Sequence, residues 1–153
     1  MNKETESAVA TREPDTSTGD FGFSVLFATT EHGAHTARLA AERALVPHLP
    51  PDTGTTDAAR LIIAELTANA ALHGRVRGRK ARLDLTLDPT CLLVEVTDAR
   101  GDHLPAPPPD SEAGDGEGGR GLLLVEALAD GWGWRPHHPG GKTVWAVLVT
   151  RTE

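Results

Sequence analysis

The chain has 153 residues, which is enough for one domain of ordinary size with a buried core. Its 22 acidic and 15 basic residues give a formal net charge of -7, and no basic block is large enough to hold a nucleic-acid backbone. The single cysteine, Cys91, excludes an intrachain disulfide framework and any site built from two thiolates. Neither a membrane span nor a signal peptide is apparent, so we expect a cytoplasmic protein with no membrane or direct nucleic-acid partner.

The first elements follow a polar N-terminal segment. Residues 1–20 are acidic and have almost no large apolar side chain, which predicts a disordered tail. Residues 21–28 alternate bulky and small side chains, as a half-buried strand does. From residue 32 to about residue 49, apolar residues recur with helical spacing, and two prolines mark the end of this helix. The folded domain is therefore expected to span residues 21–153.

A second helix is predicted for residues 55–73. Thr55 and Asp57 supply capping and first-turn chemistry, and Gly74 is a typical residue at which a helix stops. This helix carries most of the polar residues that could form a site.

Two of these polar residues lie one turn apart on the second helix. On a helical wheel, Glu65 and Asn69 fall in the same inward arc as Leu61 and Leu72, while Thr67 lies opposite. An unpaired buried polar group costs about 1 to 3 kcal/mol, so both side chains need partners. The partner is either a neighbouring backbone group or a ligand, since an amide oxygen suits Mg²⁺ and a carboxylate can act as a general base.

The second half of the chain alternates strands with loop-like segments. Residues 79–88 and 92–97 are strand patterns separated by a short turn, which predicts an antiparallel hairpin. Residues from about 102 to 118 are rich in proline, glycine and acidic residues, which predicts a lid loop. The remaining expected elements are a short helix over residues 122–129 and two strands over residues 132–135 and 143–150.

The order of these elements predicts an α+β fold. We expect a two-layer sandwich with a mostly antiparallel sheet and helices on one face.

Three further polar features are weak indicators when taken singly. Asp98 ends a strand, where a lone Asp usually caps or turns the chain. Gly119-Arg120-Gly121 before a helix leaves N–H groups free for phosphate oxygens, although short Gly-x-Gly runs are common. Lys142 and Thr143 open the last strand and could add a charge and a hydroxyl, but such residues more often form a solvated strand edge.

Taken in order, the motifs resemble the four boxes of the GHKL ATPase/kinase superfamily. The boxes are Glu65–Gly74, Asp98–Gly101, Gly119–Leu122 and Gly141–Thr143, and the resemblance covers about residues 21–150. The pattern is most similar to the small bacterial anti-sigma-factor serine/threonine kinases. The resemblance implies a Bergerat-type ATP-binding fold.

The resemblance also implies a role for each site residue. Asn69 would ligate Mg²⁺, Glu65 would be the general base, and Asp98 would accept the adenine amino group, with Gly101 packed beneath the base. The other nucleotide-binding positions would be Gly119, Arg120, Gly121 and Leu122 on the phosphate side and Thr143 in the adenine pocket. One departure is visible, because the superfamily's D-x-G-x-G box has here a single later glycine in a shifted register.

The function implied by this resemblance is that of an ATP-binding regulatory protein with ATP and Mg²⁺ as cofactors. Such a protein would sequester a sigma factor, phosphorylate an antagonist protein on Ser or Thr, and be compatible with a homodimer. A different class stays open, namely a non-catalytic module in which ATP sets the shape of the lid and of a protein-binding face without turnover. The altered glycine box after Asp98 favours this alternative.

Overall fold

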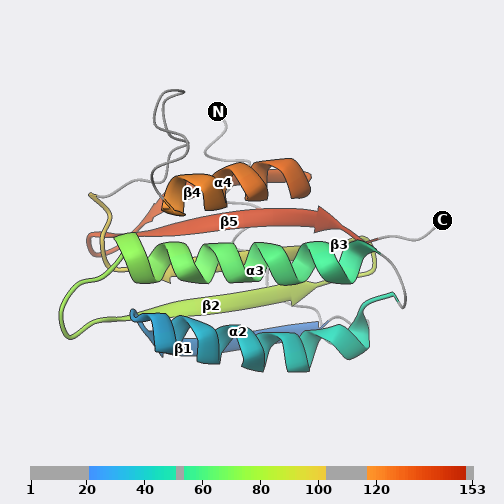
Figure 1. Ribbon diagram of the computed structural model, residues 1–153, viewed down its shortest axis with the longest axis horizontal. Helices are drawn as coiled ribbons and strands as arrows, with labels where there is room; N and C mark the ends of the chain where they lie inside the picture. Colours follow the sequence, from blue (N-terminus) through green and yellow to red (C-terminus); the bar gives the residue numbers. More distant parts are fainter. Residues whose placement is uncertain (1–20, 51–53, 103–116, 151–153) are drawn as a thin grey trace.

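The computed structural model describes residues 21–50, 54–102 and 117–150. Within these ranges the chain forms one five-stranded sheet and three α-helices, and the helices all lie on one face of the sheet (Figure 1). The predicted α+β two-layer sandwich is therefore confirmed. The expected tail, residues 1–20, and most of the expected lid, residues 102–118, lie outside the described residues.

The five strands pair antiparallel throughout, in the spatial order β1-β2-β3-β5-β4. The last strand, β5, thus inserts between β3 and β4 and pairs along its length with both. The strands span Phe21–Ala28 (β1), Lys80–Leu87 (β2), Cys91–Asp98 (β3), Gly131–His137 (β4) and Gly141–Val149 (β5).

The predicted hairpin between β2 and β3 is confirmed, and the side chain of Asp88 closes its turn. The Oδ1 atom of Asp88 accepts hydrogen bonds from the backbone N–H of Thr90 at 2.8 Å and of Cys91 at 2.9 Å. An Asp side chain that satisfies the next backbone donors in this way is a common means of reversing the chain.

Three helices cover the sheet. Helix α2 (Glu31–Leu45) begins after Thr30, whose hydroxyl accepts a hydrogen bond from Gly33 N at 2.9 Å, and a 3-10 turn, η2 (Val46–His48), follows it. Helix α3 (Gly54–His73) lies between α2 and α4 (Glu117–Leu128) (Figure 1). Among the described helices, none is both long and apolar enough to span a membrane.

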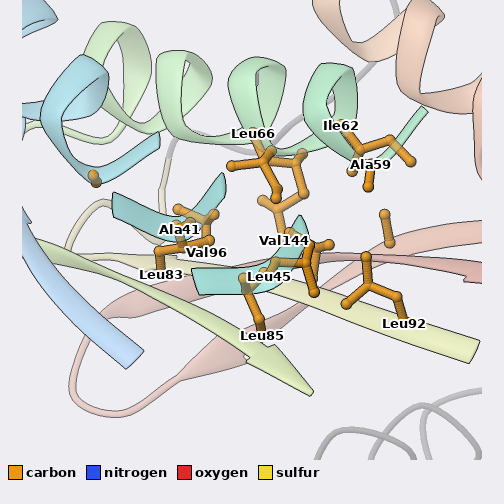
Figure 2. Packing of buried hydrophobic residues seen from close by; sticks show 14 of the residues in the cluster. Ala41, Leu45, Ala59, Ile62, Leu66, Leu83, Leu85, Leu92, Val96 and Val144 are labelled. Atoms are coloured by element: carbon orange, nitrogen blue, oxygen red, sulfur yellow. The ribbon is translucent and has the colours of Figure 1, made fainter. Parts of the chain in front are cut away.

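The core lies between the helix layer and the inner face of the sheet. Side chains alternate between the two faces of a strand, so Val96 shares the inner face with Asp98, and Val144 shares it with Lys142. Figure 2 shows part of the resulting cluster: Ala41 and Leu45 from α2, Ala59, Ile62 and Leu66 from α3, and Leu83, Leu85, Leu92, Val96 and Val144 from the sheet.

The inward arc expected for the second helix is partly wrong. Leu61 and Leu72 are 42% and 53% exposed, whereas Thr67 is buried and donates to the carbonyl of Ile63 at 2.8 Å. The reason is that α3 contacts the sheet with one side and its neighbouring helices with both flanks, so its buried surface is not the apolar arc of the wheel.

The last helix also differs from expectation. Helix α4 begins at Glu117 rather than at Leu122, so residues 117 and 118 belong to a helix and not to the lid. Gly119 therefore lies in the first turn of α4, where backbone N–H groups have no partner within the helix, while Gly121 lies in the second turn. The phosphate-binding loop expected before this helix is thus part of the helix.

Candidate functional site

The centre of the candidate site is a buried ion pair at the end of β3 and the start of β5. The Lys142 Nζ atom lies 3.0 Å from Oδ1 and 2.9 Å from Oδ2 of Asp98, and it donates to the carbonyl of Arg100 at 2.9 Å. Asp98 Oδ1 also accepts from Arg100 N at 2.8 Å. An ammonium group has three N–H donors, so these three acceptors use all of them.

Strand register places these two charges together. Asp98 and Lys142 are directly opposite each other in the antiparallel β3–β5 pair, and such residues point to the same face of a sheet. That face is the inner one, so Asp98 is only 4% exposed and Lys142 only 1%. The solvated strand edge considered for Lys142 is therefore wrong, since its stem and ammonium are enclosed in the interior.

Glycines let the backbone close around this ion pair. A Cβ atom on Gly74, just after α3, would lie 2.2 Å from Asp98 Oδ2, and one on Gly141 would lie 2.3 Å from the Asp98 carbonyl oxygen. Gly101 N donates to the carbonyl of Gly140 at 2.7 Å, which ties the segment after β3 to the β4–β5 turn. The structure thus packs Gly74 and Gly141 against Asp98 and Gly101 against the β4–β5 turn, while the roles of Asp98 and Gly101 in an adenine pocket stay predictions.

Glu65 and Asn69 lie on α3, the helix that ends against Asp98. Asn69 is buried at 7% exposure and Glu65 is half-buried. Neither side chain hydrogen bonds to another residue of the described part of the chain. Burial raises the pKa of the Glu65 carboxyl above its ordinary value of 4.5, because desolvation disfavours the charged form. Both groups are therefore free to accept from, or ligate, a bound molecule.

A groove adjoins Glu65 between α2 and α3. Its volume is about 480 Å³, and its walls include Glu31, His35, Arg38 and Leu72 as well as Glu65. The guanidinium of Arg38 is held within α2, where it donates to Glu42 Oε2 at 3.1 Å and lies 2.8 Å from His35 Nδ1. The carboxyl of Glu65 is thus reachable from outside through a groove whose wall also holds the Glu31 carboxylate and the Arg38 guanidinium, which is paired with Glu42.

Thr143 lies on the other face of the sheet from the ion pair. Its hydroxyl is 2.7 Å from that of Thr97, and both residues are buried. The same face carries Glu95, which accepts from Arg135 Nη2 at 2.6 Å; burial raises the pKa of Glu95, and Arg135 counteracts this shift. The role of Thr143 in an adenine pocket stays a prediction, and so does the role of Gly119, Arg120, Gly121 and Leu122 in phosphate binding.

The phosphate-side residues all belong to α4. Leu122 is buried at 3% exposure, and Gly119, Arg120 and Gly121 are described only in their helical backbone. The first turn of a helix carries free N–H groups at its positive end, so Gly119 keeps the backbone chemistry that the sequence suggested for anion binding.

Sequence reasoning missed the importance of Lys142. It weighed this residue as a surface charge and assigned the polar function of the last box to Thr143. The signal was the strand alternation itself, because Lys142 has the same parity as Val144 and Ala146, which face the core. That Asp98 lies opposite Lys142 could be seen only from the pairing of β3 with β5, which joins residues 44 positions apart.

Comparison with known proteins identifies the family of this chain. The model of the histidine kinase-like ATPase domain family matches residues 27–148, a span that includes all four boxes and every described helix. The chain belongs to this family, and the identification of a GHKL-type, ATP-binding domain is confirmed. A search of curated proteins found no match.

The chemical groups present at the candidate site are of the types that an adenine nucleotide requires. Adenine requires an acceptor for its exocyclic amine, and a nucleotide-bound Mg²⁺ prefers oxygen ligands, which the Asp98 carboxylate and the Asn69 amide supply respectively. Asn69 and Glu65 have no side-chain partner among the described residues, while both oxygens of Asp98 already accept from Lys142. Within the described ranges, no cluster of three or more His, Cys, Asp or Glu side chains could hold a metal ion.

Proposed function

We propose that this protein is an ATP-dependent serine/threonine protein kinase of the anti-sigma-factor type. It would transfer a phosphoryl group from ATP to an antagonist protein and would sequester a sigma factor when the antagonist is absent. The observation that supports the kinase activity is the pair Glu65 and Asn69, one turn apart on α3 and without partners in the described chain.

Each of the two residues has a separate task in this proposal. ATP would supply the phosphoryl group and would bind as its Mg²⁺ complex. The amide oxygen of Asn69 would hold the metal ion, and the Glu65 carboxylate would accept the proton of the attacking Ser or Thr hydroxyl, with ADP as the leaving group. The raised pKa of Glu65 supports this assignment, because a carboxylate that binds its proton more tightly is a stronger base.

The groove between α2 and α3 supports a protein as the phosphate acceptor. Glu65 forms part of its wall, so a hydroxyl on an exposed loop of another protein can reach the carboxylate from this side.

A second function, a non-catalytic ATP-dependent protein-binding module, is favoured by one observation. The Asp98 carboxylate is paired with Lys142 and nearly inaccessible, so the purine contact expected at this position is already taken. A site that binds nucleotide weakly suits a switch better than an enzyme with turnover.

The test combines equilibrium ATP binding, with and without Mg²⁺, with transfer of labelled phosphate to candidate antagonist proteins. Asn69→Ala should weaken Mg²⁺-dependent ATP binding by about tenfold or more, as expected for a lost metal ligand. Glu65→Gln should keep ATP binding and lose about 10² to 10⁴ in transfer rate. Glu126→Gln, at an exposed position of α4, is the matched control and should change neither quantity. ATP binding by the parent without transfer to any candidate would favour the non-catalytic module.

A further inference from the structure

The Asp98 carboxylate is enclosed on every side that the structure describes. Oδ1 accepts from Arg100 N and from Lys142 Nζ, and Oδ2 accepts from the same ammonium. Oδ2 also faces Gly74 so closely that a single added carbon atom would lie 2.2 Å away. The side chain of Asp98 is 3% exposed and that of Lys142 is 1% exposed. A ligand amine can therefore reach this carboxylate only if the ammonium leaves it.

Replacing the Lys142 ammonium by a ligand amine at Asp98 gains little binding free energy. An ammonium donates charge-assisted hydrogen bonds, which are roughly twice as strong as those of a neutral donor such as a purine amine. An ammonium that has left Asp98 also loses the acceptor that the Arg100 carbonyl provides. The state in which Asp98 is open to a ligand is thus a minor one, and the apparent affinity for a ligand falls by the fraction of that state.

From this geometry we propose that Lys142 is a specificity-determining residue that competes with the purine amine for Asp98. The proposal rests on the nucleotide site proposed above. It names Lys142 as the group that sets how strongly the site prefers adenine to purines without an amine. With Lys142 in place, the exocyclic amine contributes little to binding, so affinity comes mainly from the sugar and phosphate groups. Without the ammonium, Asp98 selects purines that carry an amine at this edge.

The experiment compares two ligands that differ only in this amine, ATP and purine riboside 5′-triphosphate, by isothermal titration calorimetry. The parent should bind both within about threefold of each other. Lys142→Met removes the competing ammonium and keeps an unbranched side chain. It should bind ATP at least about tenfold more tightly than the parent does, and prefer ATP to the analogue by about tenfold, if the open state of the parent is populated at about 10% or less.

The control is Lys80→Met, which removes an equal charge from an exposed position on β2 and should bind both nucleotides as the parent does. The parent alone already decides the question if Lys142→Met fails to fold. A parent that prefers ATP to the analogue by tenfold or more would overturn the proposal, because the amine then reaches Asp98 with Lys142 present. In a folded Lys142→Met protein, unchanged or weaker ATP affinity would overturn it as well.

Failure of this inference is distinguishable from failure of the proposed kinase. If the parent binds ATP with a strong preference over the analogue, the nucleotide site stands and only the competition by Lys142 is refuted. If the parent and Lys142→Met bind neither triphosphate, both proposals are refuted together. Absence of phosphate transfer bears on the kinase alone and leaves the ligand comparison intact.

Discussion

Gly74 ends α3 directly against the carboxylate of Asp98, with room for a hydrogen but not for a carbon atom. A Cβ at position 74 would lie 2.2 Å from Oδ2 and 2.4 Å from Cγ of Asp98. Because the ion pair holds this carboxylate from the other side, we expect Gly74→Ala to lower the free energy of unfolding by about 1 to 3 kcal/mol. Chemical denaturation followed by circular dichroism measures this loss.

The matched control lies at the opposite end of the same helix. Gly54 begins α3, and a Cβ there would meet nothing within 4 Å. Gly54→Ala should be neutral or stabilise the protein by up to about 1 kcal/mol through helix propensity. Equal losses from the two substitutions would show that the contact with Asp98 does not matter.

The buried ion pair predicts a strongly non-additive pair of mutations. Lys142→Met leaves the Asp98 carboxylate without a counter-charge, and removal of one partner of a buried pair costs about 3 to 5 kcal/mol. The double variant Asp98→Asn with Lys142→Met leaves no charge behind and should lose much less. Arg82→Ala, which breaks the exposed pair with Asp84, is the control and should cost at most about 1 kcal/mol. Additive losses in the double variant would contradict the pairing.

The half-buried carboxyl of Glu65 predicts a pH-dependent stability difference. The folded state raises the pKa of Glu65, so it binds the proton more tightly than the unfolded chain does. The stabilisation from this proton is complete below the unfolded pKa and is lost as the pH rises through the folded pKa. Glu65→Gln stays neutral at every pH, so its melting temperature relative to the parent should be higher at pH 7 than at pH 4. A difference that does not vary with pH, or that matches Glu126→Gln, would contradict the shift.

The Thr97–Thr143 hydroxyl pair on the outer face of the sheet is expected to contribute to stability and not to ATP affinity. Thr143→Val leaves the buried Thr97 hydroxyl without its partner and should cost about 1 to 3 kcal/mol, most of which Thr97→Val should restore in the double variant. ATP affinity should change by less than about threefold, since this hydroxyl faces away from Asp98 and Lys142. A tenfold loss of ATP affinity would instead place Thr143 in the adenine pocket.

The elements themselves were predictable because their signals are local. The strand at Phe21–Ala28 has the same bounds in the sequence pattern and in the structure, and the hairpin follows from a turn whose Asp88 bonds the next donors. The end of α3 at His73 was also predicted, but for a different reason. Gly74 was expected as a typical residue at which a helix stops, whereas the positive φ angles among the described glycines occur at Gly78 and Gly140. At Gly74 the requirement is space for Asp98.

The parts that could not be predicted depend on contacts between distant segments. The burial of Thr67 and the exposure of Leu72 follow from the position of α3 between two other helices, which a helical wheel does not contain. The burial of Lys142 follows from the pairing of β5 with β3 across 44 residues. The two candidate site residues that lie within one helix, Glu65 and Asn69, could be selected from their spacing. That neither has a side-chain partner in residues 21–50, 54–102 and 117–150 could be learned only from the structure.

The position of β5 has a consequence for how the protein folds. The first three strands and two helices adjoin one another in the order of the chain, whereas β5 enters the sheet last and joins β3 to β4. Pairing between segments far apart in sequence is slow, because a long loop must be closed before the contacts form. Lys142, the counter-ion of Asp98 in the described part of the chain, arrives with this strand, so a folding intermediate that holds only the first three strands lacks the ion pair. The nucleotide site proposed here is therefore completed only when β5 has paired with β3.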